Sequence, residues 1–397
     1  GCEALNASTL HALAYRILMR NHVLAATQRV PRPLNVFETD AMTADLVDAH
    51  DGKKEVRKLI QAYDAAWARL NHQVPGYAPT PKDAAFQADL LSWLVFHEAM
   101  LIGEVIPELF RYLSANPLAA ERSEFSHILV DEYQDLNKAE QRIIELLSNV
   151  AHVTIVGDDD QSIYSFKHAH PDGIRDWLVA NAGAADVNLV DCQRCPTTVV
   201  QMANALIGHN QLRPVPRPLN PLPAKGAGDV HILQFPSLDA EVAGVVARIQ
   251  ARIAAGTPAG DILVLAQSRA VGTPLFDALQ AVGVAVRSEY TESELQAEAA
   301  QYAFSLLKLL ADRNDRVALR WLLGCTSATF NAGGYRRLRN HCEASGQSPW
   351  EALEELSAGI RAIPHTRALV TSFNTLVASI QALAAKPNLG EVIDTLF

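Results

Sequence analysis

The chain has 397 residues, of which 49% are hydrophobic and 20% are charged, with five cysteines and a formal net charge of −10. This length allows two or three domains, and the composition is that of an ordinary soluble globular protein. No apolar run approaches the ~18 residues of a membrane span, five cysteines are too few for a disulfide framework, and the negative charge argues against a surface that coats nucleic acid. Because the first residues also lack a secretory layout, we expect a cytoplasmic protein with no membrane partner.

The first part of the chain is predicted to be mostly helical. Residues 8–20 place apolar side chains at helical spacing after a Ser8/Thr9 start signal. Residues 53–70 form a second amphipathic stretch, and residues 82–114 a longer one after two prolines. Between about 30 and 120 the pattern therefore predicts an α-helical insertion.

The next segment has the pattern of an α/β domain. HILV (127–130) and VTIV (153–156) are short apolar runs typical of buried strands, and an amphipathic helix is predicted between them. Strand, helix and strand at this spacing favour a βαβ unit in a parallel sheet. VNLV (187–190) is predicted as a third strand, followed by a helix that begins at Pro196.

A second α/β series is predicted after a proline-rich connector at 211–228. From residue 291 onward the pattern is helical again. The predicted elements between these points are strands at HILQF (231–235), DILVLA (261–266) and VAVRS (284–288), with helices at 239–255 and 273–282.

Two adjacent carboxylates, Asp131 and Glu132, follow the first predicted strand, with Gln134 and Asp135 close behind. A strand of a parallel sheet delivers its C-terminal residues to the ligand crevice. One carboxylate can hold Mg²⁺ through water while the other polarises an attacking water. A bare Asp-Glu pair after a strand can also merely cap the next helix, but the attached Gln134 and Asp135 favour the nucleotide site.

Three consecutive aspartates, Asp158–Asp160, follow the second predicted strand and repel one another unless they are solvated or face cations. Gln161 can both donate and accept, which suits it to sense a phosphate. Tyr164 and Phe166 share one face of an extended segment, beside Lys167, an arrangement that suits base stacking and backbone contact with nucleic acid. The alternative is that the two aromatic residues belong to the core.

DEYQD (131–135) followed by GDDDQSIYSFKHA (157–169) closely resembles motifs II and III of the UvrD/Rep/PcrA-like superfamily I DNA helicases. STLHALAYRIL (8–18) looks like that family's TFHS-type motif, and LVDCQRC (189–195) falls where the family has LxxNYRS. Residues 245–284 resemble the opening of the second motor domain, and residues 295–324 resemble the entry to the second helical insertion. The implied fold is α/β, with RecA-like parallel-sheet domains of the P-loop NTPase type and helical insertions.

The resemblance also implies a domain order. It predicts a partial first RecA-like domain at 1–28 and 120–208, with a helical insertion at 29–119. The start of a second RecA-like domain then follows at 209–290, and part of a second helical insertion at 291–397.

The family's nucleotide-site roles fall on five residues of this chain. By resemblance, Asp131 coordinates Mg²⁺, Glu132 activates water, and Gln161 senses the γ-phosphate of ATP. Gln134 couples the nucleotide to neighbouring motifs, and Arg194 matches an arginine finger that offsets charge on the transferred phosphoryl group.

The DNA-binding roles fall on a second set of residues. Thr9 and His11 match the family's contacts to single-stranded DNA. Phe166 matches a base-stacking tryptophan and Lys167 an arginine, and Tyr164 shares the stacking face. The expected partners are therefore single-stranded DNA and duplex junctions.

The chain also departs from the family pattern. Gln193 stands where the family has a tyrosine against the adenine, which puts purine selectivity in doubt. Cys192 and Cys195 form a lone C-x-x-C that suggests zinc or redox chemistry, although the match to LxxNYRS explains their position. No G-x-x-x-x-G-K-[ST] loop is present; the only Gly-Lys, at Gly52, lacks the required spacing.

We therefore expect a fragment of an ATP-dependent 3′–5′ DNA helicase or translocase that is unable to hydrolyse ATP by itself, with the phosphate loop and the late motifs outside these residues. One alternative is a non-enzymatic single-stranded DNA-binding protein derived from a helicase. Another is a metal-dependent nuclease that uses Asp131, Asp135 and Asp158–Asp160 without ATP.

Overall fold

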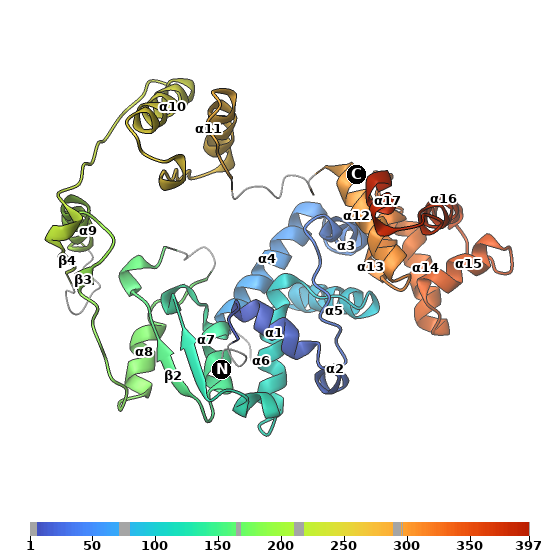
Figure 1. The fold of residues 1–397 in the computed structure, drawn as a ribbon. Helices are drawn as coiled ribbons and strands as arrows, with labels where there is room; N and C mark the ends of the chain where they lie inside the picture. The colour runs from blue at the N-terminus through green and yellow to red at the C-terminus, as the bar shows by residue number, and fades with distance from the viewer. Residues whose placement is uncertain are drawn as a thin grey trace. The chain divides into compact units, whose positions relative to one another are not determined.

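The computed structural model describes residues 6–70, 80–163, 168–209, 218–288, 295 and 297–396. The chain divides into two compact units, one made of Gly1–Ala184 and Ala297–Phe397 and the other of Ala185–Gln296. Most described elements are helices, and each unit holds one short pair of parallel strands (Figure 1). This mixture agrees with the predicted α/β class. The predicted domain limits differ from those of the compact units and stay a prediction.

The predicted βαβ unit lies in the larger compact unit. β1 (His127–Val130) and β2 (His152–Ile155) pair in parallel and directly opposite one another. α7 (Lys138–Leu147) connects them and starts at a capping box in which Asn137 and Glu140 each bond the other's backbone amide. The strands therefore end side by side, and the residues that follow each strand meet at one edge.

A layer of helices covers one face of this strand pair. α1 (Leu10–Leu18), α6 (Val105–Ala115) and α7 share a core against which Ile128 of β1 packs. Leu129, the next residue, points to the opposite face of the sheet and is 75% exposed. The buried members of this core include Ala14, Ile17, Leu18, Ile106, Leu109, Leu113, Ile143 and Leu147.

The predicted helical insertion is helical. The helical stretch predicted over 82–114 consists of two helices, α5 (Pro81–Phe96) and α6, with a turn between them. Glu98 adopts a left-handed backbone (φ 52°) in that turn, and residues 102–104 form a short 3₁₀ turn. The other helices of this region are α3 (Glu38–Leu46) and α4 (Lys53–Arg69), and α2 (Asn21–Thr27) precedes it.

The C-terminal part of the larger unit is helical, as predicted, and packs on α3. Phe37 and Ala41 at α3 belong to the same apolar core as Trp321 and Leu322 of α13. The helices of this part are α12 (Glu298–Ala311), α13 (Arg316–Leu322), α14 (Ala332–Ser345), α15 (Pro349–Ser357), α16 (Arg367–Ala384) and α17 (Leu389–Leu396).

A buried ion pair joins these two helical parts. Arg320 of α13 is fully buried and donates to both carboxylate oxygens of Asp45 on α3, over 2.6 and 2.9 Å. The indole Nε1 of Trp93 donates to the same carboxylate over 2.9 Å, and the guanidinium of Arg320 lies 4.3 Å from the centre of the Tyr335 ring. The Asp45 carboxylate therefore has two donors and is not left uncompensated in the core.

The smaller unit departs from the predicted strand pattern. VNLV (187–190), HILQF (231–235), DILVLA (261–266) and VAVRS (284–288) are not strands, so these four strand predictions are wrong for this structure. Only the carbonyl of Val190 takes part in strand pairing, because it accepts from the amide of Asn220 over 2.7 Å beside β3 and β4. Leu265 is 87% exposed and Ile232 is 90% exposed, and neither run belongs to a sheet in the described part of the chain.

The helices of the smaller unit agree better with the sequence. α10 (Leu238–Ala254) and α11 (Arg269–Ala281) pack on each other through Val246, Ile249, Leu275 and Leu279. The other elements are β3 (Asp191–Cys192) and β4 (Asn220–Pro221), which pair in parallel, and α9 (Thr197–Ile207). α8 (Gly173–Ala180) belongs to the larger unit. Among all described residues, every helix is too short or too polar to cross a membrane.

Candidate functional site

Asp131 and Glu132 leave the end of β1 through a sharp turn. Glu132 has a left-handed backbone (φ 49°, ψ 43°), which is uncommon for a residue with a side chain. Its amide donates to Oδ1 of Asp131 over 2.9 Å, and the amide of Tyr133 donates to the carbonyl of Val156 over 3.0 Å. Both carboxylates are exposed at this edge, while the ring of Tyr133 is buried beneath them. The turn is therefore held in place at Tyr133 and exposes the carboxylates of Asp131 and Glu132.

Gln134 ties the ends of the two strands together. Its side chain is buried, and its Nε2 donates to Oε2 of Glu132 over 2.7 Å. Its Oε1 accepts from the amide of Asp158, beyond β2, over 3.0 Å. A β-carbon at Gly157 would lie 2.5 Å from that Oε1, so only glycine leaves room for the Gln134 side chain. Gln134 thereby fixes the position of Glu132 relative to the second strand.

Gln161 joins the same network through Asp158. Its Nε2 donates to Oδ2 of Asp158 over 2.8 Å, and the other oxygen of Asp158 accepts from the amide of Asp160 over 3.1 Å. Gln161 is itself exposed. A continuous chain of contacts therefore runs from Glu132 through Gln134 and Asp158 to Gln161.

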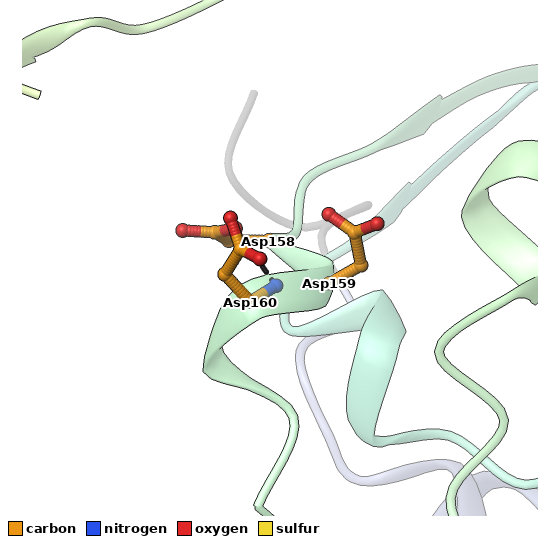
Figure 2. Close-up of side chains that lie close together, drawn as sticks. All are labelled: Asp158, Asp159 and Asp160. Atoms are coloured by element: carbon orange, nitrogen blue, oxygen red, sulfur yellow. Dashed lines mark hydrogen bonds between the residues drawn. The ribbon is translucent and has the colours of Figure 1, made fainter. Parts of the chain in front are cut away.

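The three aspartates gather on one short 3₁₀ turn, at Asp159–Gln161 and the residue before it. Figure 2 shows the carboxylates of Asp158 and Asp160 on one side of the turn and that of Asp159 on the other. One oxygen from each lies within 4.8 Å of the others. Arg175 of α8 donates from Nε to Asp159 over 3.1 Å, which offsets part of the repulsion.

The donor set suits a magnesium–nucleotide complex. Asp131 offers a hard carboxylate oxygen, the ligand type that Mg²⁺ prefers, and is exposed at the strand end. Only its Oδ1 is engaged by a hydrogen bond among the described residues, so Oδ2 is left for a ligand. Asp131 is the residue that would hold the ion, and Asp158–Asp160 form a separate group of three carboxylates that follows β2.

The predicted DNA contacts are only partly described. Thr9 caps α1 by accepting from the amide of Ala12 over 3.2 Å. His11 is the second residue of α1, and its Nδ1 lies 3.4 Å from Oε1 of Glu140, the third residue of α7 and the partner of Asn137 in the capping box. These two residues thus lie on α1, with His11 beside the start of α7. The other three predicted residues lie outside the described part of the chain: Tyr164, Phe166 and Lys167.

Arg194 belongs to the smaller compact unit, whereas Asp131, Glu132, Gln134 and Gln161 belong to the larger one. Arg194 is exposed in the bend between β3 and α9. The four residues of the larger unit are thus brought together, and the assignment of Arg194 to the same site stays a prediction.

Sequence reasoning missed the residues that support the site. Gly157 and Asp158 were recognised as part of the GDDDQ motif, but the role of Asp158 as the link between Gln134 and Gln161 was not predicted. Arg175 gave no signal, because its pairing with Asp159 depends on how α8 packs. Tyr133 is buried, and this burial raises the pKa of its hydroxyl to about 12, so the side chain is uncharged where it packs beneath the turn.

Comparison with known proteins agrees with this geometry. Residues 1–177, which contain β1, β2 and the whole Glu132–Gln161 network, match the model of the UvrD/REP helicase N-terminal domain. This part of the chain is therefore similar to a UvrD/REP helicase N-terminal domain. The resemblance found in the sequence is thereby confirmed.

Similarity to UvrD-like helicases extends beyond that domain. The chain is 30% identical over 379 residues to DNA helicase II of Escherichia coli, covering 88% of this chain and 49% of that protein. It is 23% identical over 389 residues to DNA helicase II of Haemophilus influenzae, covering 94% and 52%. It is 23% identical over 369 residues to the ATP-dependent DNA helicase PcrA of Staphylococcus epidermidis, covering 88% and 49%. The chain thus spans about half the length of the curated relatives that it matches.

Proposed function

We propose that this chain is part of an ATP-dependent DNA helicase or translocase that moves 3′ to 5′ along single-stranded DNA. The observation that carries the proposal is the chain of contacts from Glu132 through Gln134 and Asp158 to Gln161. Such a chain connects a water-activating carboxylate with a group that can sense a phosphate. The relatives named DNA helicase II and PcrA support the same reaction.

The residues of the larger unit have distinct roles in this proposal. Glu132 accepts the proton of the attacking water, and Gln134 holds the Glu132 carboxylate in place through its 2.7 Å hydrogen bond. Gln161 contacts the γ-phosphate, and its bond to Asp158 passes any movement on to Gln134. Mg²⁺, held by Asp131, offsets phosphate charge when it is bound with ATP.

The remaining roles concern the arginine and the DNA. Arg194 offsets charge on the transferred phosphoryl group when the two motor domains close. Thr9 and His11 contact the DNA backbone, while Tyr164 and Phe166 stack on bases beside Lys167. Alternating grips on the stacked bases then give net movement along the strand.

The 397 residues alone are proposed to lack ATP turnover. They contain no G-x-x-x-x-G-K-[ST] loop, and therefore no backbone cradle with a lysine for the β- and γ-phosphates. Purified chain should show negligible ATP hydrolysis with or without single-stranded DNA. Robust turnover would overturn this part of the proposal.

The function is tested with the complete polypeptide that carries these residues. A labelled duplex with a 3′ single-stranded tail should be unwound when ATP and Mg²⁺ are present, and a duplex with a 5′ tail should not. Binding of single-stranded DNA without ATP hydrolysis or unwinding would support the non-enzymatic alternative instead. Strand cutting that needs Mg²⁺ but not ATP would support the nuclease.

A further inference from the structure

Two cysteines flank Arg194 in the bend between β3 and α9. Cys192 is the last residue of β3, and Cys195 lies immediately before Pro196, the capping residue of α9. Both thiols are half-buried and free. The backbone amide of Cys195 points at Sγ of Cys192 over 3.5 Å. The bend thus turns the second cysteine back toward the first.

Both ends of this bend are anchored. Cys192 lies opposite Pro221 in the β3–β4 pair, which fixes the first end. At the second end, the amide of Thr197 donates to the carbonyl of Gly226 over 3.0 Å, and that of Thr198 to Ala227 over 2.9 Å. Only residues 193–196 connect these anchors, so the two cysteines are held near one another, while Gln193 and Arg194 between them are exposed.

The chemistry of the pair differs from that of the other described cysteines. Burial raises the pKa of the thiols of Cys325 and Cys342 to about 11, so both stay protonated and unreactive. The pKa of Cys192 is lowered by hydrogen bonds from the amides of Cys195 and Arg194 and by the charge of Arg194. The pKa of Cys195 is raised by burial and by its neighbour Cys192. A thiol of lowered pKa beside a thiol of raised pKa is the arrangement for attack and resolution.

We propose that Cys192 and Cys195 are a thiol–disulfide pair, oxidised by small peroxides, that controls the position of Arg194. The part of this proposal that concerns control rests on the proposed function of Arg194; the thiol chemistry does not. A zinc site is a weaker reading, because the described residues place no third cysteine, histidine or carboxylate ligand with the pair.

The oxidation balances in two steps. The Cys192 thiolate attacks one oxygen of hydrogen peroxide, the O–O bond breaks, and sulfenic acid forms at Cys192 with release of one water after proton uptake. The Cys195 thiol then attacks the Cys192 sulfur, the S–O bond breaks, and a second water leaves as the disulfide forms. Two thiols and one peroxide thus give one disulfide and two waters. A small dithiol reverses the reaction by exchange.

The disulfide would act on Arg194 through the backbone. A bond between Cys192 and Cys195 closes a small ring that contains Gln193 and Arg194. The Sγ of Cys192, which accepts from the Cys195 amide in the reduced form, is then bonded covalently to the Sγ of Cys195. Because both ends of the bend are anchored, the ring constrains the two residues between them. Arg194 then loses the freedom to reach a phosphoryl group, and ATP turnover falls.

The thiol chemistry can be mapped on the purified chain. Trypsin cuts after Arg194 but not at the Arg-Pro bonds that follow, so Cys192 falls in peptide 176–194 and Cys195 in peptide 195–225. After peroxide treatment and alkylation, mass spectrometry without reductant should find these two peptides linked. Cys192 should react at least ~10-fold faster than Cys325 or Cys342. A chain with Cys325→Ser and Cys342→Ser should form the same link, and Cys192→Ser should not.

The mapping has two outcomes that overturn the proposal. In the first, both peptides stay separate and alkylated under conditions that oxidise free cysteine. In the second, Cys192 is linked to a cysteine other than Cys195 or to a second copy of the chain.

Control of Arg194 is tested in the complete polypeptide. Peroxide should lower DNA-stimulated ATP turnover ~10-fold or more, dithiothreitol should restore it, and Cys192→Ser should keep its own rate through the treatment. Unchanged turnover despite a mapped disulfide would overturn the control of Arg194. If the reduced polypeptide shows no DNA-stimulated turnover at all, the proposed function fails and the control fails with it, whereas the peptide mapping still decides the thiol chemistry.

Discussion

At the scale of single residues, the site depends on the close packing around Gln134. Its amide group bonds Glu132 on one side and the backbone of Asp158 on the other, in a space that Gly157 leaves open. The sequence motifs predicted Asp131, Glu132 and Gln161 as site residues, because their residue types suit phosphate chemistry. The sequence did not predict the two hydrogen bonds of Gln134 that connect Glu132 with Asp158, because this connection depends on distances between residues more than twenty positions apart.

Gly157→Ala should loosen this connection. The added β-carbon would lie 2.5 Å from Oε1 of Gln134 and 3.2 Å from the backbone nitrogen of Tyr133, so Gln134 must move. We expect a loss of ~1–3 kcal/mol in the free energy of unfolding, measured by urea denaturation. Gly183→Ala is the matched control, because no heavy atom lies within 4 Å of its added carbon. Equal effects of the two substitutions would contradict the packing described here.

Asp64→Asn should stabilise the protein at neutral pH. Burial, reinforced by the charge of Glu104, raises the pKa of Asp64 from 3.8 to about 6, and its Oδ1 is buried with no hydrogen-bond partner among the described residues. As pH rises from about 4 to 6, the unfolded chain releases this proton before the folded one, so wild-type stability falls over that window.

The variant has no such proton to lose. The free energy of unfolding of Asp64→Asn should exceed that of the wild type by an amount that grows between pH 4 and 6. This difference should level off above pH 6 at about 1–3 kcal/mol, since one pKa unit is worth ~1.4 kcal/mol. Asp394→Asn, at an exposed carboxylate of α17, should leave the pH profile unchanged. An advantage of Asp64→Asn that is constant from pH 3 to pH 8 would show that the carboxyl does not titrate as described.

At the scale of elements, the sequence predicted helices better than strands. α1, α4, α7 and α10 lie where apolar periodicity placed them, because a helix closes its own backbone hydrogen bonds. An apolar run such as DILVLA shows only a tendency to form a strand, since a strand also needs a neighbouring strand with which to form backbone hydrogen bonds. HILV and VTIV have each other and pair, whereas DILVLA is not paired with another strand in the described part of the chain.

The link between α3 and α13 depends on the buried Arg320–Asp45 pair. Asp45→Ala leaves the fully buried guanidinium of Arg320 without its carboxylate and removes the acceptor of Trp93. We expect a loss of ~3–5 kcal/mol in thermal or urea denaturation.

An exposed ion pair between the same two regions serves as control. Asp48 and Arg336 lie 2.8 Å apart, with 65% and 49% of their side chains exposed. Asp48→Ala should cost no more than ~1 kcal/mol, because water screens this pair. If Asp45→Ala costs as little as Asp48→Ala, Arg320 does not depend on its partner.

At the scale of the whole molecule, the family was readable because its motifs are short, ordered and chemically specific. The sequence did not place Arg194 relative to the Glu132–Gln161 network, because the two lie in different compact units. The central claim is therefore that Glu132, held by Gln134, is the base that activates water for ATP hydrolysis.

The most direct test is Glu132→Gln in the complete polypeptide. The amide keeps the size of the side chain but cannot accept the proton of water, so DNA-stimulated ATP turnover should fall ~100-fold or more while single-stranded DNA binding is retained. Glu145→Gln, at an exposed residue of α7, should keep wild-type turnover. Turnover by Glu132→Gln within about twofold of wild type would contradict the account, since general-base catalysis is worth at least ~100-fold.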